Sequence, residues 1–153
     1  MLNSIKKLLG QVAEASTASS LPENEDQLLA SAAAMLLLEV AWADHDMSTQ
    51  EIELIKTSLQ KLFDLSTALT QQLVDDARAK HDASVGLYEY TRTLNDDLNP
   101  EEKFDLMVAL WRLANSDQIL HSLEEHAIRR ISELLYVPHA LFIRAKQVAR
   151  QTA

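Results

Sequence analysis

Residues 40–51 read VAWADHDMSTQE and residues 113–124 read LANSDQILHSLE, so one pattern occurs twice, 73 positions apart. Each copy reads as the end of an apolar helix, an aspartate, a short turn, and a new helix that opens with an acidic residue. The alignment pairs Asp44 with Asp117, Glu51 with Glu124, and Ile55 with Ile128. The repeat predicts a helical domain with two pseudo-symmetric helical hairpins and carboxylates at equivalent points in both.

The composition favours helices along the whole chain. Only two of the 153 residues are glycine, whereas sheet-rich folds use many glycines in turns. No segment alternates apolar and polar residues over the length of a strand, so we expect an all-α fold. The glycines are also too few for a phosphate-binding loop, and the absence of cysteine excludes thiolate metal sites and thiol nucleophiles.

The formal net charge of −9 restricts the classes of partner. An acidic protein repels phosphate backbones, so we expect no nucleic acid, whereas cations or a basic protein surface would suit it. No apolar run reaches the roughly 20 residues of a membrane span, and no leader with a long apolar core and cleavage site is present. We therefore expect a cytoplasmic protein.

We expect two parts, an N-terminal helix and linker over residues 1–24 and a helical domain over residues 25–153. The apolar residues of the N-terminal helix, over residues 2–15, have helical spacing: Leu2, Ile5, Leu8, Leu9 and Val12. This segment is either a peripheral packing helix or a short amphipathic anchor for a membrane surface or a partner. Residues 16–24 form a linker of mostly small residues.

Capping and periodicity divide the domain into helices, seven to eight in all with the N-terminal one. Ser48 and Glu51 form a capping box, and Asn99 precedes a proline at the first helical position. Trp42 and Trp111 are expected in the core. The expected helices of the domain are the one that Ser48 caps and six others, which cover 26–44, 66–82, 85–94, 100–116, 122–136 and 138–151.

Asp44 and Asp117 follow the C-terminal ends of helices, where unpaired carbonyls make a carboxylate unfavourable. A Ca²⁺- or Mg²⁺-type cation would relieve that conflict, with Asp46 and Glu51 as further oxygen ligands. Alternatively, each aspartate accepts hydrogen bonds from amides of the following turn. The spacing is not that of an EF-hand, because Thr49 stands where the loop needs glycine.

The acids near the start of the second helix in each copy could serve only as capping residues, or they could belong to a site that the repeat preserves. Capping of Ser48 alone explains Glu51. In the second copy the capping partner of Ser122 would be Glu125, whereas the repeat selects Glu124. The five histidines lack the spacing of a helical zinc site and are interpreted as surface or capping residues. The paired acids elsewhere are interpreted as solvated faces and helix starts.

Four segments resemble the TerB family of tellurite-resistance proteins. They are LLLEVAWAD at 36–44, LYEYTRTLN at 87–95, LWRLA at 110–114 and LLYVPHALFIRAK at 134–146, and the resemblance covers about residues 28–148. It implies an all-helical fold with pseudo-twofold symmetry, a link to tellurite resistance, stress or phage defence, and acidic residues as a metal or partner surface. The family's acids correspond to Glu39, Asp44, Glu51, Asp117 and Glu124.

The chain departs from the family pattern in both turns. His45 and Gln118 stand where the family has a turn glycine, and Ile119 replaces the acid that Asp46 retains in the first copy. These changes weaken a complete second metal site.

We expect a non-enzymatic module that binds a partner protein or a divalent cation through this acidic surface. The alternative is a structural interaction module in which the carboxylates only cap. A metal-dependent hydrolase is a third interpretation, and it would need a cleft and a general base beside the metal.

Overall fold

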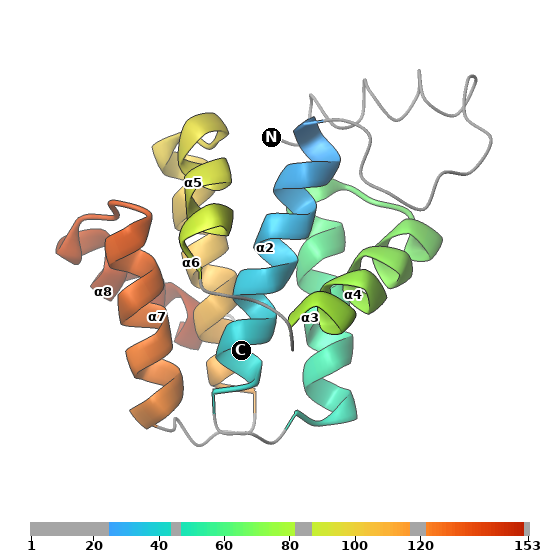
Figure 1. The fold of residues 1–153 in the computed structure, drawn as a ribbon. Helices are drawn as coiled ribbons and strands as arrows, with labels where there is room; N and C mark the ends of the chain where they lie inside the picture. The colour runs from blue at the N-terminus through green and yellow to red at the C-terminus, as the bar shows by residue number, and fades with distance from the viewer. Residues whose placement is uncertain (1–24, 44–46, 82–86, 117–121, 152–153) are drawn as a thin grey trace.

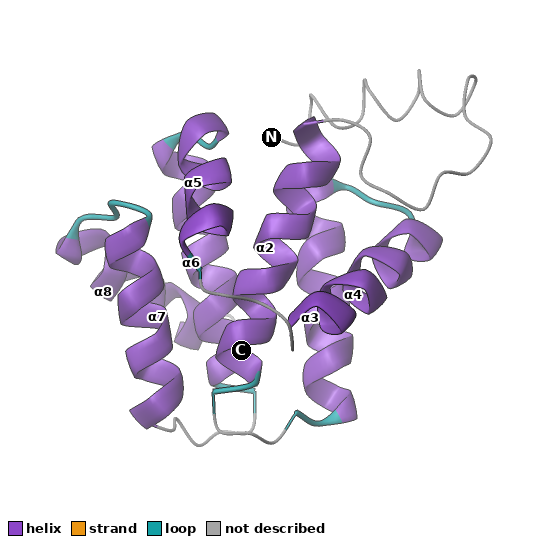
Figure 2. Ribbon diagram, viewed as in Figure 1, coloured by secondary structure: helices purple, strands orange, loops and turns teal. Residues whose placement is uncertain are grey.

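A computed structural model describes residues 25–43, 47–81, 87–116 and 122–151. Every regular element in these residues is a helix and none is a strand (Figure 2). The helices are α2 (Glu25–Ala41), α3 (Thr49–Phe63), α4 (Thr67–His81), α5 (Tyr88–Asp97), α6 (Pro100–Ala114), α7 (Ser122–Leu134) and α8 (His139–Gln151). The expected all-α fold is confirmed for this part of the chain. The expected N-terminal helix and linker lie outside the described residues.

Helix α2 is the centre of the domain and packs against α3, α4, α5, α6 and α7 (Figure 1). Its sequence explains this position, because a helix that is apolar on nearly every side is stable only when other elements surround it. Ala30, Ala33 and Ala34 are fully buried and let neighbouring helices approach closely. The run from Leu36 to Leu38 is also fully buried.

The two halves of the domain repeat one another in three dimensions. Ala41 and Ala114 end the first helices and Thr49 and Ser122 begin the second ones, so both hairpins keep the 73-residue spacing of the sequence repeat. Helix α4 packs on α2 as α8 packs on α6, and α3 contacts α6 as α7 contacts α2. Helix α5 connects the halves and packs against α2 and α7. The expected pair of pseudo-symmetric hairpins is thus confirmed.

Local capping determines where two of the helices begin. Ser48 accepts a hydrogen bond from the Glu51 amide at 3.1 Å, and the Glu51 carboxylate accepts one from the Ser48 amide at 3.2 Å. At α6, Asn99 and Glu102 make the same reciprocal pair at 2.8 and 2.9 Å. Both boxes satisfy amides that a helix start would otherwise leave without partners. The sequence-based prediction of these two starts is confirmed.

Several predicted boundaries are wrong by two or three residues. Helices α2 and α6 were expected to reach residues 44 and 116 but end at Ala41 and Ala114. Helix α5 was expected over residues 85–94 but covers Tyr88–Asp97, and its last turn closes where the Leu98 amide donates to the Leu94 carbonyl at 2.8 Å. Helix α7 was expected to reach Tyr136 but ends at Leu134. Tyr136 instead has φ 57°, and the amide that follows it donates to the Ser132 carbonyl, which is the hydrogen-bond pattern of a Schellman C-cap.

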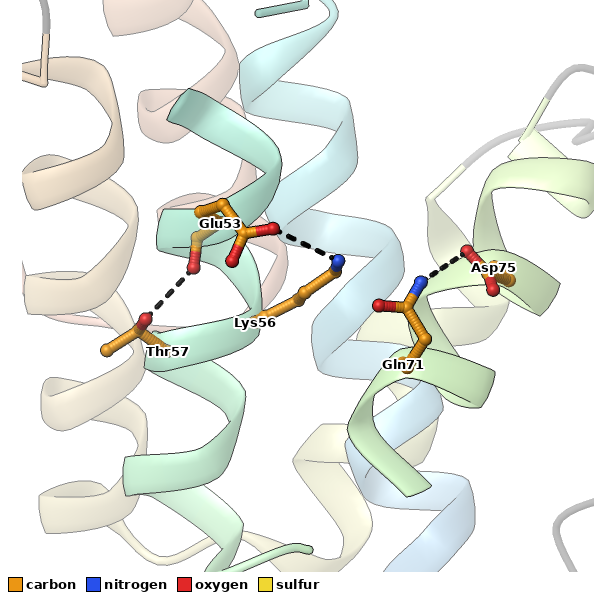
Figure 3. A network of polar contacts seen from close by, with 5 residues as sticks. All are labelled: Glu53, Lys56, Thr57, Gln71 and Asp75. Atoms are coloured by element: carbon orange, nitrogen blue, oxygen red, sulfur yellow. Dashed lines mark hydrogen bonds and ion pairs between the residues drawn. The ribbon is translucent and has the colours of Figure 1, made fainter. Parts of the chain in front are cut away.

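The outer faces of α3 and α4 carry short polar contacts within each helix (Figure 3). Lys56 lies 3.2 Å from Glu53, Thr57 donates to the Glu53 carbonyl, and Gln71 donates to Asp75 at 2.9 Å. Such exposed contacts contribute only about 0.2–0.5 kcal/mol each and mark solvated faces. Within the described residues, no helix combines the length and apolar character that crossing a membrane requires.

The two tryptophans have different environments. Trp111 is fully buried, as expected, but Trp42 is 40% exposed, so its predicted core position is wrong. The reason is local, because Trp42 lies in the turn just beyond the last residue of α2, where the chain leaves the packed helices.

Asp26 lies at the end of α2 opposite the hairpin turns and is only 9% exposed. Its Oδ2 atom has no hydrogen-bond partner among the described residues. Burial raises the pKa of this carboxyl group, and the carboxylates of Asp97 and Glu102 raise it further. The charged form of Asp26 is therefore unfavourable in the folded protein.

Asp26→Asn is expected to increase the free energy of unfolding at pH 7 by about 0.5–2 kcal/mol. The folded-state pKa of Asp26 lies above its unfolded value, so protonation of this carboxyl stabilises the fold at low pH. That stabilisation is lost as pH rises through the folded-state pKa. The gain should therefore shrink at a second, acidic pH below the folded-state pKa, where the wild-type carboxyl is also protonated. Urea unfolding at both pH values, with the exposed Glu133→Gln as control, measures this. An equal gain at both pH values would contradict the assignment.

Candidate functional site

Both hairpins turn at the same end of the molecule, which is the lower end in Figure 1. Helices α2 and α6 finish there and α3 and α7 begin there. The fold thus brings together four helix ends that are distant in the sequence. The N-terminal ends of α3 and α7 carry partial positive charge and favour nearby carboxylates.

Glu51 occupies the first turn of α3. Its carboxylate closes the capping box and also lies 3.3 Å from the hydroxyl oxygen of Ser48. It remains partly accessible to solvent. Capping therefore fixes the position of Glu51 at the hairpin end. The same carboxylate can cap the helix and also contact a bound ion or partner.

Glu124 occupies the equivalent place in α7 and is only 2% exposed. Its neighbour Glu125 points elsewhere, with a side chain 33% exposed that lies 3.4 Å from Lys146 and 3.8 Å from Arg129. The acid that the repeat selects is thus the buried one. The alignment is supported further by Ile55 and Ile128, which are both fully buried.

The predicted turn ligands Asp44, Asp46 and Asp117 lie outside the described residues. Among the residues that are described, no three histidine, aspartate or glutamate side chains are grouped as a metal site would require. Of the predicted site residues, the structure therefore places only Glu51 and Glu124, in the first turns of α3 and α7 at the same end of the domain (Figure 1).

A contact at the same end was missed by sequence reasoning. The His81 ring nitrogen Nε2 lies 2.9 Å from the Glu39 carboxylate and links α4 to α2. The prediction that every histidine is a surface or capping residue is wrong for His81, whose side chain is only 13% exposed. No local signal could have found this pair, because 42 residues separate its members.

Trp42 covers one side of this contact. Its ring meets the His81 ring edge to face, with centroids 6.2 Å apart. The two rings border a hollow of about 310 Å³ whose other lining residues are Leu38, Met47, Asp75, Arg78 and Ala79. An exposed aromatic ring beside charged side chains is a feature of protein interaction surfaces.

Residues 30–147 match the family model described as tellurite resistance protein TerB. The chain belongs to the TerB family. The TerB match begins within α2 and ends within α8, so it includes both hairpins and the end at which they turn. No curated protein and no solved structure gives a significant match to the chain. Glu39, Glu51 and Glu124 all belong to the matched region.

Proposed function

We propose that this chain is a non-enzymatic TerB-like module that binds a divalent cation of the Ca²⁺ or Mg²⁺ type where its hairpins turn. The proposed ligands are Asp44, Asp46, Glu51, Asp117 and Glu124. The observation that supports the proposal most is the burial of Glu124, which is 2% exposed in the first turn of α7. The non-enzymatic character of the proposed module is supported by the family, whose domain is generally non-catalytic.

The physical argument concerns the cost of burying a carboxylate. Removing an ionised carboxylate from water is expensive unless opposite charge or hydrogen bonds compensate. The N-terminal end of α7 favours a carboxylate at this position, and a cation shared with the turn aspartates would stabilise it further. Carboxylate and carbonyl oxygens are the hard ligands that Ca²⁺ and Mg²⁺ prefer.

Isothermal titration of the metal-stripped chain with Ca²⁺, Mg²⁺, Mn²⁺ and Zn²⁺ tests the proposal. We expect saturable binding of Ca²⁺ or Mg²⁺ that Glu124→Gln weakens at least tenfold, because one charged oxygen ligand is replaced by a neutral amide. Asp44→Asn should have a similar effect.

Glu125→Gln is the matched control, since it makes the same chemical change one residue away on a side chain that contacts Lys146 and Arg129. It should leave cation affinity unchanged. The cation proposal fails if no ion binds, or if Glu124→Gln binds as tightly as wild type while circular dichroism shows that it is folded. The carboxylates would then have a structural role only.

Partner binding is a second candidate function, favoured by the exposed Trp42 ring and the hollow beside it. We propose that a protein partner contacts this surface and that the module acts in tellurite resistance, as the family description suggests, or in a stress response. Comparing tellurite tolerance of cells that carry wild-type, Trp42→Ala or Glu124→Gln protein would separate the two surfaces. Equal tolerance in all three would count against both.

A further inference from the structure

A groove follows α2 between α4 and α5, and it is independent of the hairpin end. Its floor consists of Leu28, Ser31, Ala32 and Met35 of α2, and Leu73 and Tyr90 lie along its sides. The hollow has a volume of about 180 Å³. Leu28 is 48% exposed, although α2 is otherwise surrounded by other helices. Ala32 and Met35 are already buried at 3% and 2% exposure, so Leu28 is the large apolar residue of this face that remains uncovered.

The floor residues have the spacing of one helix face, at positions i, i+3, i+4 and i+7. Large side chains stand at the two ends, Leu28 and Met35, and small ones stand between them, Ser31 and Ala32. Such a face has a depression at its centre that receives large side chains from a facing helix.

The N-terminal segment has the complementary pattern. Ile5, Leu8, Leu9 and Val12 stand at the same four spacings, and here two leucines occupy the central positions. Both faces extend over about 10 Å, because each covers seven residues of helical rise. Leu8 and Leu9 would therefore lie over Ser31 and Ala32.

We propose that residues 2–12 pack as a helix, antiparallel to α2, in the groove between α4 and α5. Residues 13–24 connect the segment to Glu25, one helical turn before Leu28. These twelve residues exceed the roughly 2–8 that usually join antiparallel helices in bundles, so the connection is long enough for the antiparallel arrangement. A tether this short holds the segment at an effective concentration on the order of millimolar, which favours it over an untethered partner.

Paramagnetic labelling of the full chain tests the contact, and the absence of native cysteine makes each introduced label unique. A spin label on Lys80→Cys, at the groove, should broaden the amide NMR signals of residues 2–12. A label on Thr57→Cys is the control, since Thr57 lines a different hollow, of about 590 Å³, between α3, α6 and α8. The control label should leave these signals sharp.

The paired substitution Leu8→Ser with Leu9→Ser should abolish the broadening, whereas Lys7→Ser, on the opposite side of the expected helix, should preserve it. The proposal is overturned if the Lys80 label has no effect, if the Thr57 label broadens the segment instead, or if broadening survives the double serine substitution. It is also overturned if residues 2–12 lose signal only when phosphatidylcholine–phosphatidylserine vesicles are added, which would identify a membrane surface as the occupant.

Discussion

Trp111→Ala is expected to lower the free energy of unfolding by about 3–5 kcal/mol, since it removes the largest fully buried side chain of the core. The Trp111 ring meets Phe142 edge to face at 5.3 Å between centroids, and the ammonium of Lys146 lies 5.0 Å from its centroid. Its indole nitrogen has no hydrogen-bond partner in the described residues, so removing the ring does not deprive another polar group of a hydrogen bond. The loss therefore measures packing. Urea unfolding at constant pH provides the value.

Trp42→Ala is the matched control, because it removes the same atoms from a site that is 40% exposed. We expect a loss of less than about 1 kcal/mol. A loss at Trp42 as large as that at Trp111 would mean that the turn beyond α2 contributes to the core in a way that the structure does not show.

Ala33→Leu should destabilise the protein by about 1–3 kcal/mol or prevent its accumulation, because it adds volume at the fully buried centre of α2. Helix α2 has packing neighbours on nearly every side, so the longer side chain cannot be accommodated without moving α4, α5 or α6. Cores of native density tolerate such additions poorly. Thermal unfolding followed by circular dichroism at 222 nm would measure the effect.

Ala140→Leu provides the comparison, since Ala140 is an exposed residue of α8. The same change there should alter stability by no more than about 0.5 kcal/mol. If both variants unfold like wild type, the close packing around α2 described above is wrong.

The features that the sequence predicted well depend on local chemistry. Ser48 with Glu51, and Asn99 with Glu102, are three residues apart, so a capping box can be recognised without knowing the rest of the fold. The repeat also placed Ile55 and Ile128 at matching buried positions, because each lies six residues after the first residue of its helix, Thr49 in α3 and Ser122 in α7.

The features that sequence reasoning missed depend on tertiary context. Exposure of Trp42 follows from where α2 ends relative to its neighbours, and the contact between Glu39 and His81 joins residues on different helices. Burial of Glu124 rather than Glu125 was left open, because both acids fall in the first turn of α7 and only packing distinguishes them. The predicted ligands Asp44, Asp46 and Asp117 stay predictions.

The central position of α2 has a consequence for synthesis of the protein. The ribosome completes α2 near residue 41, but the helices that surround it are not finished until residue 134. At typical elongation rates the roughly 90 intervening residues take about 5–18 s, during which the most apolar segment of the chain lacks its neighbours. A nascent chain of this design needs protection from aggregation for that interval, so its yield in cells should depend on chaperones that bind exposed apolar helices.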